Sequence, residues 1–256
     1  MKIMVLNHCN DISLSATNSS EMVEQHLCAR LVKELGGGYA SNLGINLAIM
    51  EPDEIFKWFL ASVLFGARIG ESIAMDTYKE FEKKGVLSPD AILETGWQGL
   101  VGILDQGGYV RYDSKTATKL VEVMGAIKEK YKGDLNLLHF SAKDERDLED
   151  KLQRLARGIG PVTVNIFLRE LRDLWEKAEP LLCDPALLAA ESLGLISATD
   201  AHSALEELRM MWETSEQGEG RFSDFEAALL RLGKNYCRKK RCHLCPVNPE
   251  CQSERV

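Results

Sequence analysis

Apolar residues recur at steps of three and four along most of the chain, the spacing that gathers them on one face of an α-helix. No segment alternates between apolar and polar residues over the length of a half-buried strand. Serines, prolines and glycines stand where helices should begin and end. Helices are predicted for residues 21–35, 53–67, 69–84, 89–95, 97–104, 114–131, 144–156, 161–174, 186–193, 200–214 and 222–232. The pattern therefore predicts an all-α fold.

Two features of the predicted helix ends are specific. Ser20 is the expected N-cap of the first helix, which should end before the glycines at 36–38. Pro52 stands near the first position of the second helix, where proline is favoured. These positions mark the expected ends of the first helix and the expected start of the second.

Length and charge limit the class of protein. The 256 residues suffice for one large or two modest domains. The apolar run at 3–6 is too short for a signal peptide, and no stretch approaches the roughly 18–20 apolar residues of a membrane span. We therefore expect a cytoplasmic protein without a membrane partner. The net charge of −8 argues mildly against nucleic acid, unless basic residues gather locally.

Four of the seven cysteines gather near the C-terminus. Cys237, Cys242, Cys245 and Cys251 have the spacing C-x4-C-x2-C-x5-C. In a reducing compartment clustered cysteines bind metal more often than they form disulfides. A compact run of four thiolates favours a [4Fe–4S] cluster, because a structural zinc site usually has two C-x2-C knuckles with a longer insert. Zinc and unligated cysteines remain alternatives. The isolated Cys9, Cys28 and Cys183 are expected to be small core residues.

The first loop of this cysteine cluster is strongly basic. Arg238, Lys239, Lys240 and Arg241 follow one another, and residues 227–249 hold six basic residues and no acidic one. In a protein of net charge −8 this is a local reversal of sign. It predicts a surface that contacts phosphates, with an ordinary solvated loop as the alternative.

A glycine-containing turn joins two predicted helices at residues 155–165. Gly158 and Gly160 can adopt left-handed dihedrals, so the helices can approach closely, with Ile159 pinned between them. The backbone N–H groups of the turn and of the first turn of the next helix, which includes Val162 and Thr163, could then bind a phosphate. An ordinary turn between two helices is the alternative.

The hairpin and the cysteines together resemble the endonuclease III family of helix-hairpin-helix DNA glycosylases. The resemblance can be followed from Pro52 to Cys251. The segment 229–237 resembles the helix and glycine that lead into the family's first cysteine. Tyr-Asp-Ser-Lys at 112–115 resembles the family's Tyr-Asn-Ser-Lys, and Cys183-Asp184 resembles the Val-Asp that carries its catalytic aspartate.

The resemblance implies two helical domains with DNA in the cleft between them. Residues 53–172 would form a helical barrel that ends in the hairpin. Residues 1–52 and 173–256 would form a second domain that holds the [4Fe–4S] cluster. Arg68 falls close to the family's wedge glutamine, which fills the gap left by an extruded base. A buried or surface-paired arginine is an equal alternative.

The resemblance also implies catalytic residues. Asp184 would stabilise the developing sugar cation and orient the attacking water, and Asp113 is a second candidate acid. A turn or helix-cap role is the alternative for both. The chain departs from the family at Val162, which stands where bifunctional members have a Schiff-base lysine, and at Ala186, which replaces a common histidine. The first cysteine gap is four residues instead of six.

The sequence therefore predicts a monofunctional DNA glycosylase. It would hydrolyse the N-glycosidic bond of a damaged or mismatched base in double-stranded DNA, as a monomer associated with the nucleoid. One alternative is a non-catalytic iron–sulfur protein that binds damaged or structured DNA. Another is a helical interaction domain stabilised by zinc.

Overall fold

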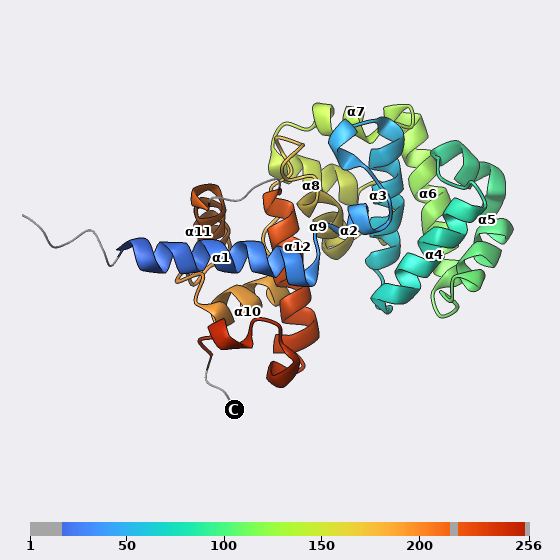
Figure 1. The fold of residues 1–256 in the computed structure, drawn as a ribbon. Helices are drawn as coiled ribbons and strands as arrows, with labels where there is room; N and C mark the ends of the chain where they lie inside the picture. The colour runs from blue at the N-terminus through green and yellow to red at the C-terminus, as the bar shows by residue number, and fades with distance from the viewer. Residues whose placement is uncertain (1–16, 216–219, 254–256) are drawn as a thin grey trace, which may run out of the picture.

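The computed structural model describes residues 17–215 and 220–253, with side chains from residue 26 onward. These residues form helices, turns and loops, and no strand occurs among them, so the all-α prediction is confirmed. None of the helices in these two ranges is long and apolar enough to cross a membrane. Figure 1 shows how the helices are arranged.

The first ten elements run from the N-terminal helix to the end of the hairpin. They are α1 (Thr17–Leu35), α2 (Tyr39–Asn42), η1 (Leu47–Ile49), α3 (Pro52–Phe65), α4 (Glu71–Lys83), α5 (Pro89–Gln106), α6 (Asp113–Tyr131), α7 (Leu135–Ser141), α8 (Glu145–Gln153) and α9 (Pro161–Arg169). The remaining elements are α10 (Asp184–Leu193), α11 (Ala201–Thr214), α12 (Phe222–Leu232), η2 (Gly233–Cys237), η3 (Cys242–Leu244) and η4 (Asn248–Glu250).

Most predicted helices are present, with a few differences at their ends. Helix α12 has the predicted bounds, and α3 begins at Pro52 as expected. Helix α1 begins at Thr17, so the prediction of Ser20 as its N-cap is wrong. Helix α9 ends at Arg169, five residues early, because the chain continues in turns. The sequence pattern missed α2 and α7, which are short.

Helix α3 is the centre of the core. It buries residues on every side because it packs against α4, α7 and α9. The Trp58 Nε1–H donates a hydrogen bond to the Phe167 carbonyl of α9 over 3.0 Å, and the Phe59 ring meets the Phe167 ring edge-on. A buried tryptophan needs such a partner for its N–H group. These contacts fix α9, and with it the hairpin, against the core.

The C-terminal helices gather around α12. Helix α12 packs against α1 and α10, and α1 also contacts α11. In Figure 1 α1 lies across α12, while α10 and the turns that follow α12 lie together near the C-terminus. The N-terminal helix is therefore part of the same group of helices as the cysteine-containing turns.

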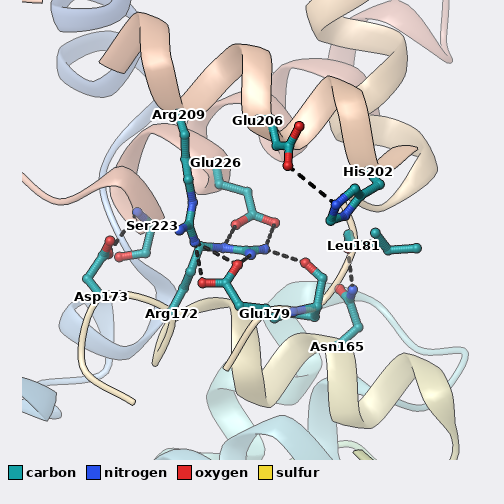
Figure 2. A network of polar contacts seen from close by, with 11 residues as sticks. Asn165, Arg172, Asp173, Glu179, Leu181, His202, Glu206, Arg209, Ser223 and Glu226 are labelled. Atoms are coloured by element: carbon teal, nitrogen blue, oxygen red, sulfur yellow. Dashed lines mark hydrogen bonds and ion pairs between the residues drawn. The ribbon is translucent and has the colours of Figure 1, made fainter. Parts of the chain in front are cut away.

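A buried ion-pair network joins the segment after α9 to α11 and α12 (Figure 2). Arg172 donates to the Glu226 carboxylate over 3.0 Å, to the Pro180 carbonyl over 2.6 Å and to Glu179 over 3.2 Å. Arg209 of α11 approaches the other side of Glu179 at 2.6 Å. Because Arg172 and Glu226 are fully buried, each charge depends on its partner.

Candidate functional site

The hairpin lies between α8 and α9 and is partly as predicted. Ile159 is only 4% exposed, so its side chain is buried, as expected for a residue pinned between two helices. Gly158 has a φ of 94°, which favours glycine strongly. Gly160, by contrast, has a φ of −106° and a ψ of 178°, and a Cβ added there would meet no atom within 4 Å. The expectation that Gly160 needs unusual dihedrals is therefore wrong.

Two residues in the first turn of α9, Val162 and Thr163, differ in their exposure to solvent. Val162 is 64% exposed. Thr163 is buried. The Thr163 Oγ1 lies so close to Gly66 that a Cβ added to this glycine would be only 2.1 Å away. The Thr163 side chain therefore packs against α3 and cannot reach DNA, which corrects its prediction as a contact residue. Only its backbone N–H remains available for an anion.

Asp184 is the first residue of α10 and is exposed. The start of α10 is pressed against the end of α12, where a Cβ on Gly233 would lie 1.7 Å from the Pro185 carbonyl oxygen. No side chain fits there, which explains the glycine before the first clustered cysteine. Ala186, at the position of the family's histidine, is fully buried.

A cavity of about 530 Å³ brings the predicted catalytic region together. Val162 lines it from α9, Asp184 from α10, and Lys234 and Arg238 from the turns after α12. Lys234 forms an ion pair with Glu71 of α4 at 2.9 Å. Asp184 makes no ion pair with any residue that the structure describes. The lining thus combines the accessible carboxylate of Asp184 with basic groups.

Arg169 and Tyr39 also line this cavity, and sequence reasoning had singled out neither. Arg169, at the end of α9, is 6% exposed, and its Nε–H has no hydrogen-bond partner within the described residues. Its guanidinium lies 5.2 Å from the centre of the Tyr39 ring. Burial raises the pKa of Tyr39 to about 12, so this phenol is neutral at physiological pH. Nothing in the helical pattern marks Arg169, because helices commonly carry a basic residue in the last turn.

Asp113 and Arg68 lie elsewhere. Asp113 begins α6, accepts a hydrogen bond from the Ser114 backbone N–H, and does not line the cavity of Asp184. That N–H lowers the pKa of Asp113. This geometry is that of a turn aspartate. Arg68 is exposed between α3 and α4 and lines a second cavity together with Gly158.

The four clustered cysteines all line one small cavity of about 280 Å³. Cys242 is exposed and the other three are partly buried. The loop after Cys237 turns back tightly, because the Lys240 N–H donates to the Cys237 carbonyl over 3.0 Å with Lys240 at a φ of 51°. A four-residue gap is therefore long enough to return Cys242 to the same cavity.

The chemistry of these thiols suits a cationic centre. Burial raises the pKa of the Cys237 thiol, and the nearby Cys245, Cys251 and Cys242 raise it further. Four thiolates in one cavity therefore repel one another unless positive charge lies between them. Within the described ranges, however, no three His, Cys, Asp or Glu side chains are close enough to hold a metal ion as they stand.

Helices α1 and α10 hold the cysteine-containing turns in place through an ion pair and hydrogen bonds. Arg30 of α1 pairs with the Glu250 carboxylate and donates to the Pro246 carbonyl. The Gln252 N–H donates to the Ser192 carbonyl at the end of α10 over 2.8 Å. Helix α1, which lies before the segment that carries the resemblance, thus contacts the cysteine-containing turns.

The basic run is exposed along its whole length, from Arg238 to Arg241, and forms no ion pair with the part of the chain that is described. Arg238 also lines the cavity of Asp184. Of the isolated cysteines, Cys28 is a core residue as predicted, and Cys183 is partly buried beside the same cavity. Cys9 lies outside the described residues.

No protein-family model matches the sequence, and no curated protein matches it either.

Proposed function

We propose that the chain is a DNA glycosylase of the helix-hairpin-helix type, with a [4Fe–4S] cluster on its four C-terminal cysteines. The observation that carries the proposal is the 530 Å³ cavity. Its lining combines residues from the start of α9, Asp184 at the start of α10, and residues of the turns after α12 that lead to the cysteines. Three separate parts of the resemblance thus meet at one place.

The DNA would be held by two surfaces. The N–H groups at the start of α9 are free for a phosphate, because helix N-termini favour anions. The exposed run from Arg238 to Arg241 has no acidic partner among the described residues and offers four positive charges to the backbone. Binding by a local surface is compatible with a net charge of −8.

The chemistry would be hydrolysis of the N-glycosidic bond of an extruded damaged or mismatched nucleotide. Asp184, as a carboxylate, would face the sugar, stabilise its developing positive charge and orient the attacking water. Val162 offers no amine at the position where a Schiff base would form. Lys234 is the lysine that lines the same cavity, but its ammonium group is held by Glu71. The proposal is therefore a monofunctional enzyme.

Cys237, Cys242, Cys245 and Cys251 would hold the cluster, which when bound supplies a rigid cross-link between these turns. The basic loop, the hairpin and the cleft then have fixed relative positions. In this proposal residues 53–172 form one domain, and residues 1–52 with 173–256 form the other. The 530 Å³ cavity lies where the cleft between them is expected.

The proposal is tested with a panel of duplexes, each carrying one damaged or mismatched base. The expected result is release of the free base from at least one duplex, detected by mass spectrometry. Asp184→Asn should abolish this release while DNA affinity stays nearly unchanged, because the carboxylate acts on the transition state. Tight binding of damaged duplexes without release of any base would instead support a non-catalytic DNA-binding protein.

A further inference from the structure

A second and larger cavity of about 700 Å³ shares no lining residue with the cavity of Asp184. It is lined by residues of α6, the second half of α5, the segment after α3 and the hairpin. Its size is ordinary for a site that takes a small molecule or a nucleotide. The proposed glycosylase chemistry does not use it.

Four basic side chains line this cavity: Arg68, Lys115, Lys119 and Arg157. None of them makes a hydrogen bond or ion pair with any described residue, although the protein carries an excess of acidic groups. Glu122 is the acidic residue at the lining. Four cations against one carboxylate leave an excess of positive charge at this lining, which favours an anionic ligand.

Lys119 connects the cavity to the hairpin. A Cβ on Gly158 would lie 3.1 Å from the Lys119 Cε, so the lysine stem passes directly over the hairpin glycine. Burial lowers the pKa of the Lys119 ammonium group. A bound phosphate would offset the cost of burying this charge.

Trp97 supplies an aromatic surface at the same cavity. Helix α5 is kinked at Gly96, whose φ of 65° favours glycine, and Trp97 follows the kink. The Trp97 Nε1–H donates to the Thr118 Oγ1 of α6 over 3.0 Å, which fixes the ring, yet the residue remains 44% exposed. An anchored, exposed indole beside lysines is the arrangement on which unpaired bases stack.

We propose that this cavity is a second nucleotide site, which takes an unpaired deoxynucleotide with its base on Trp97 and its phosphate on Lys119 and Arg157. The inference rests on the DNA binding of the proposed function but not on base excision. It gives the protein a place for an unpaired base that is separate from the cavity of Asp184.

The test uses a short oligothymidylate and the intrinsic tryptophan fluorescence of the full chain. Trp58 and Trp175 are buried and Trp212 is stacked on Phe225, so quenching by the oligonucleotide reports mainly on Trp97. The wild-type protein should be quenched. Trp97→Leu should remove the quenching and weaken binding about tenfold, because the stacking of one base is lost.

Matched variants separate stacking and charge from general effects. Trp97→Phe should retain part of the affinity. Lys119→Gln should weaken binding and lower the slope of log affinity against log salt concentration by about 0.7. The quenching of this variant should persist at saturation. Phe140→Leu is the control for an exposed aromatic residue, and Lys130→Gln for a lysine on α6, and both should bind like the wild type.

Two outcomes overturn the inference. One is equal binding of the oligothymidylate and an abasic oligomer of the same length, because the bases would then contribute nothing. The other is unchanged binding by Trp97→Leu with its helical signal intact. The glycosylase proposal fails separately: if Trp97 is quenched but the wild type releases no base from any duplex, only base excision is refuted. Base release without quenching refutes only the second site.

Discussion

Replacing Arg172 with methionine removes the centre of the buried network in Figure 2. The change deletes the two hydrogen bonds to Glu226, at 3.0 and 3.3 Å, and those to Pro180 and Glu179. Glu226 would then keep a buried charge without its partner. Breaking a buried pair in this way costs about 3–5 kcal/mol, a large part of the ~5–15 kcal/mol by which a folded protein is stable.

The measurement is thermal unfolding followed by circular dichroism. For a chain of this size each 1 kcal/mol shifts Tm by ~2–4 °C, so Arg172→Met should lower Tm by about 10 °C. Arg154→Met is the matched control, because Arg154 pairs with Asp150 at 3.3 Å but is 76% exposed. That change should alter stability by less than ~0.5 kcal/mol.

The double variant Arg172→Met/Glu226→Leu tests the reason for the loss. It removes both charges together and should recover much of the lost stability, because buried apolar pairs can replace buried ion pairs at little cost. The reasoning is refuted if Arg172→Met unfolds within about 2–3 °C of the wild type, a shift of ~1 kcal/mol. It is also refuted if the double variant is less stable than the single one.

Three further predictions concern the cysteines, the basic loop and the hairpin. Anaerobically purified protein should contain about four irons and four sulfides per chain, and Cys251→Ser should lose much of them; stoichiometric zinc without iron would contradict the cluster. Lys239→Ala with Lys240→Ala should weaken binding to all DNA sequences and flatten the log–log salt slope by about 1–2, and an unchanged slope would mark the run as plain solvated surface. Gly158→Ala should destabilise the protein by ~1 kcal/mol because of its positive φ, whereas Gly160→Ala should leave stability nearly unchanged, and equal effects on Tm would refute this distinction.

The helices could be predicted from the sequence wherever a long amphipathic segment begins at a clear cap. Helix α12 has its predicted bounds, and α8 and α11 each begin one residue after the predicted start, because Asp144 and Asp200 cap them with side-chain hydrogen bonds. Helices α2 and α7 were not predicted, because four and seven residues are too few to show the helical period of apolar positions. Helix α9 ends five residues before its predicted end, and Arg172, in the turns that follow, makes long-range contacts that no local pattern contains.

The candidate site could be predicted only in part. The positions of Val162 and Asp184 followed from motifs, and the structure places both at one cavity. Arg169, Lys234 and Trp97 were missed, because each gains its place from a contact between distant helices or from a kink. A periodic pattern records which face of a helix is buried, but not which polar residues meet across a cavity.

The most direct test of the central proposal is a single-turnover assay on a duplex with one labelled strand that carries the susceptible lesion. A monofunctional glycosylase leaves an intact strand with an abasic site, so the strand should break only after alkali treatment, and borohydride should trap no protein–DNA adduct. Alkali-dependent breaks that vanish in Asp184→Asn are the predicted result. A trapped adduct that is lost in Lys234→Gln would contradict the monofunctional mechanism, and the absence of any break with all duplexes bound would contradict the glycosylase itself.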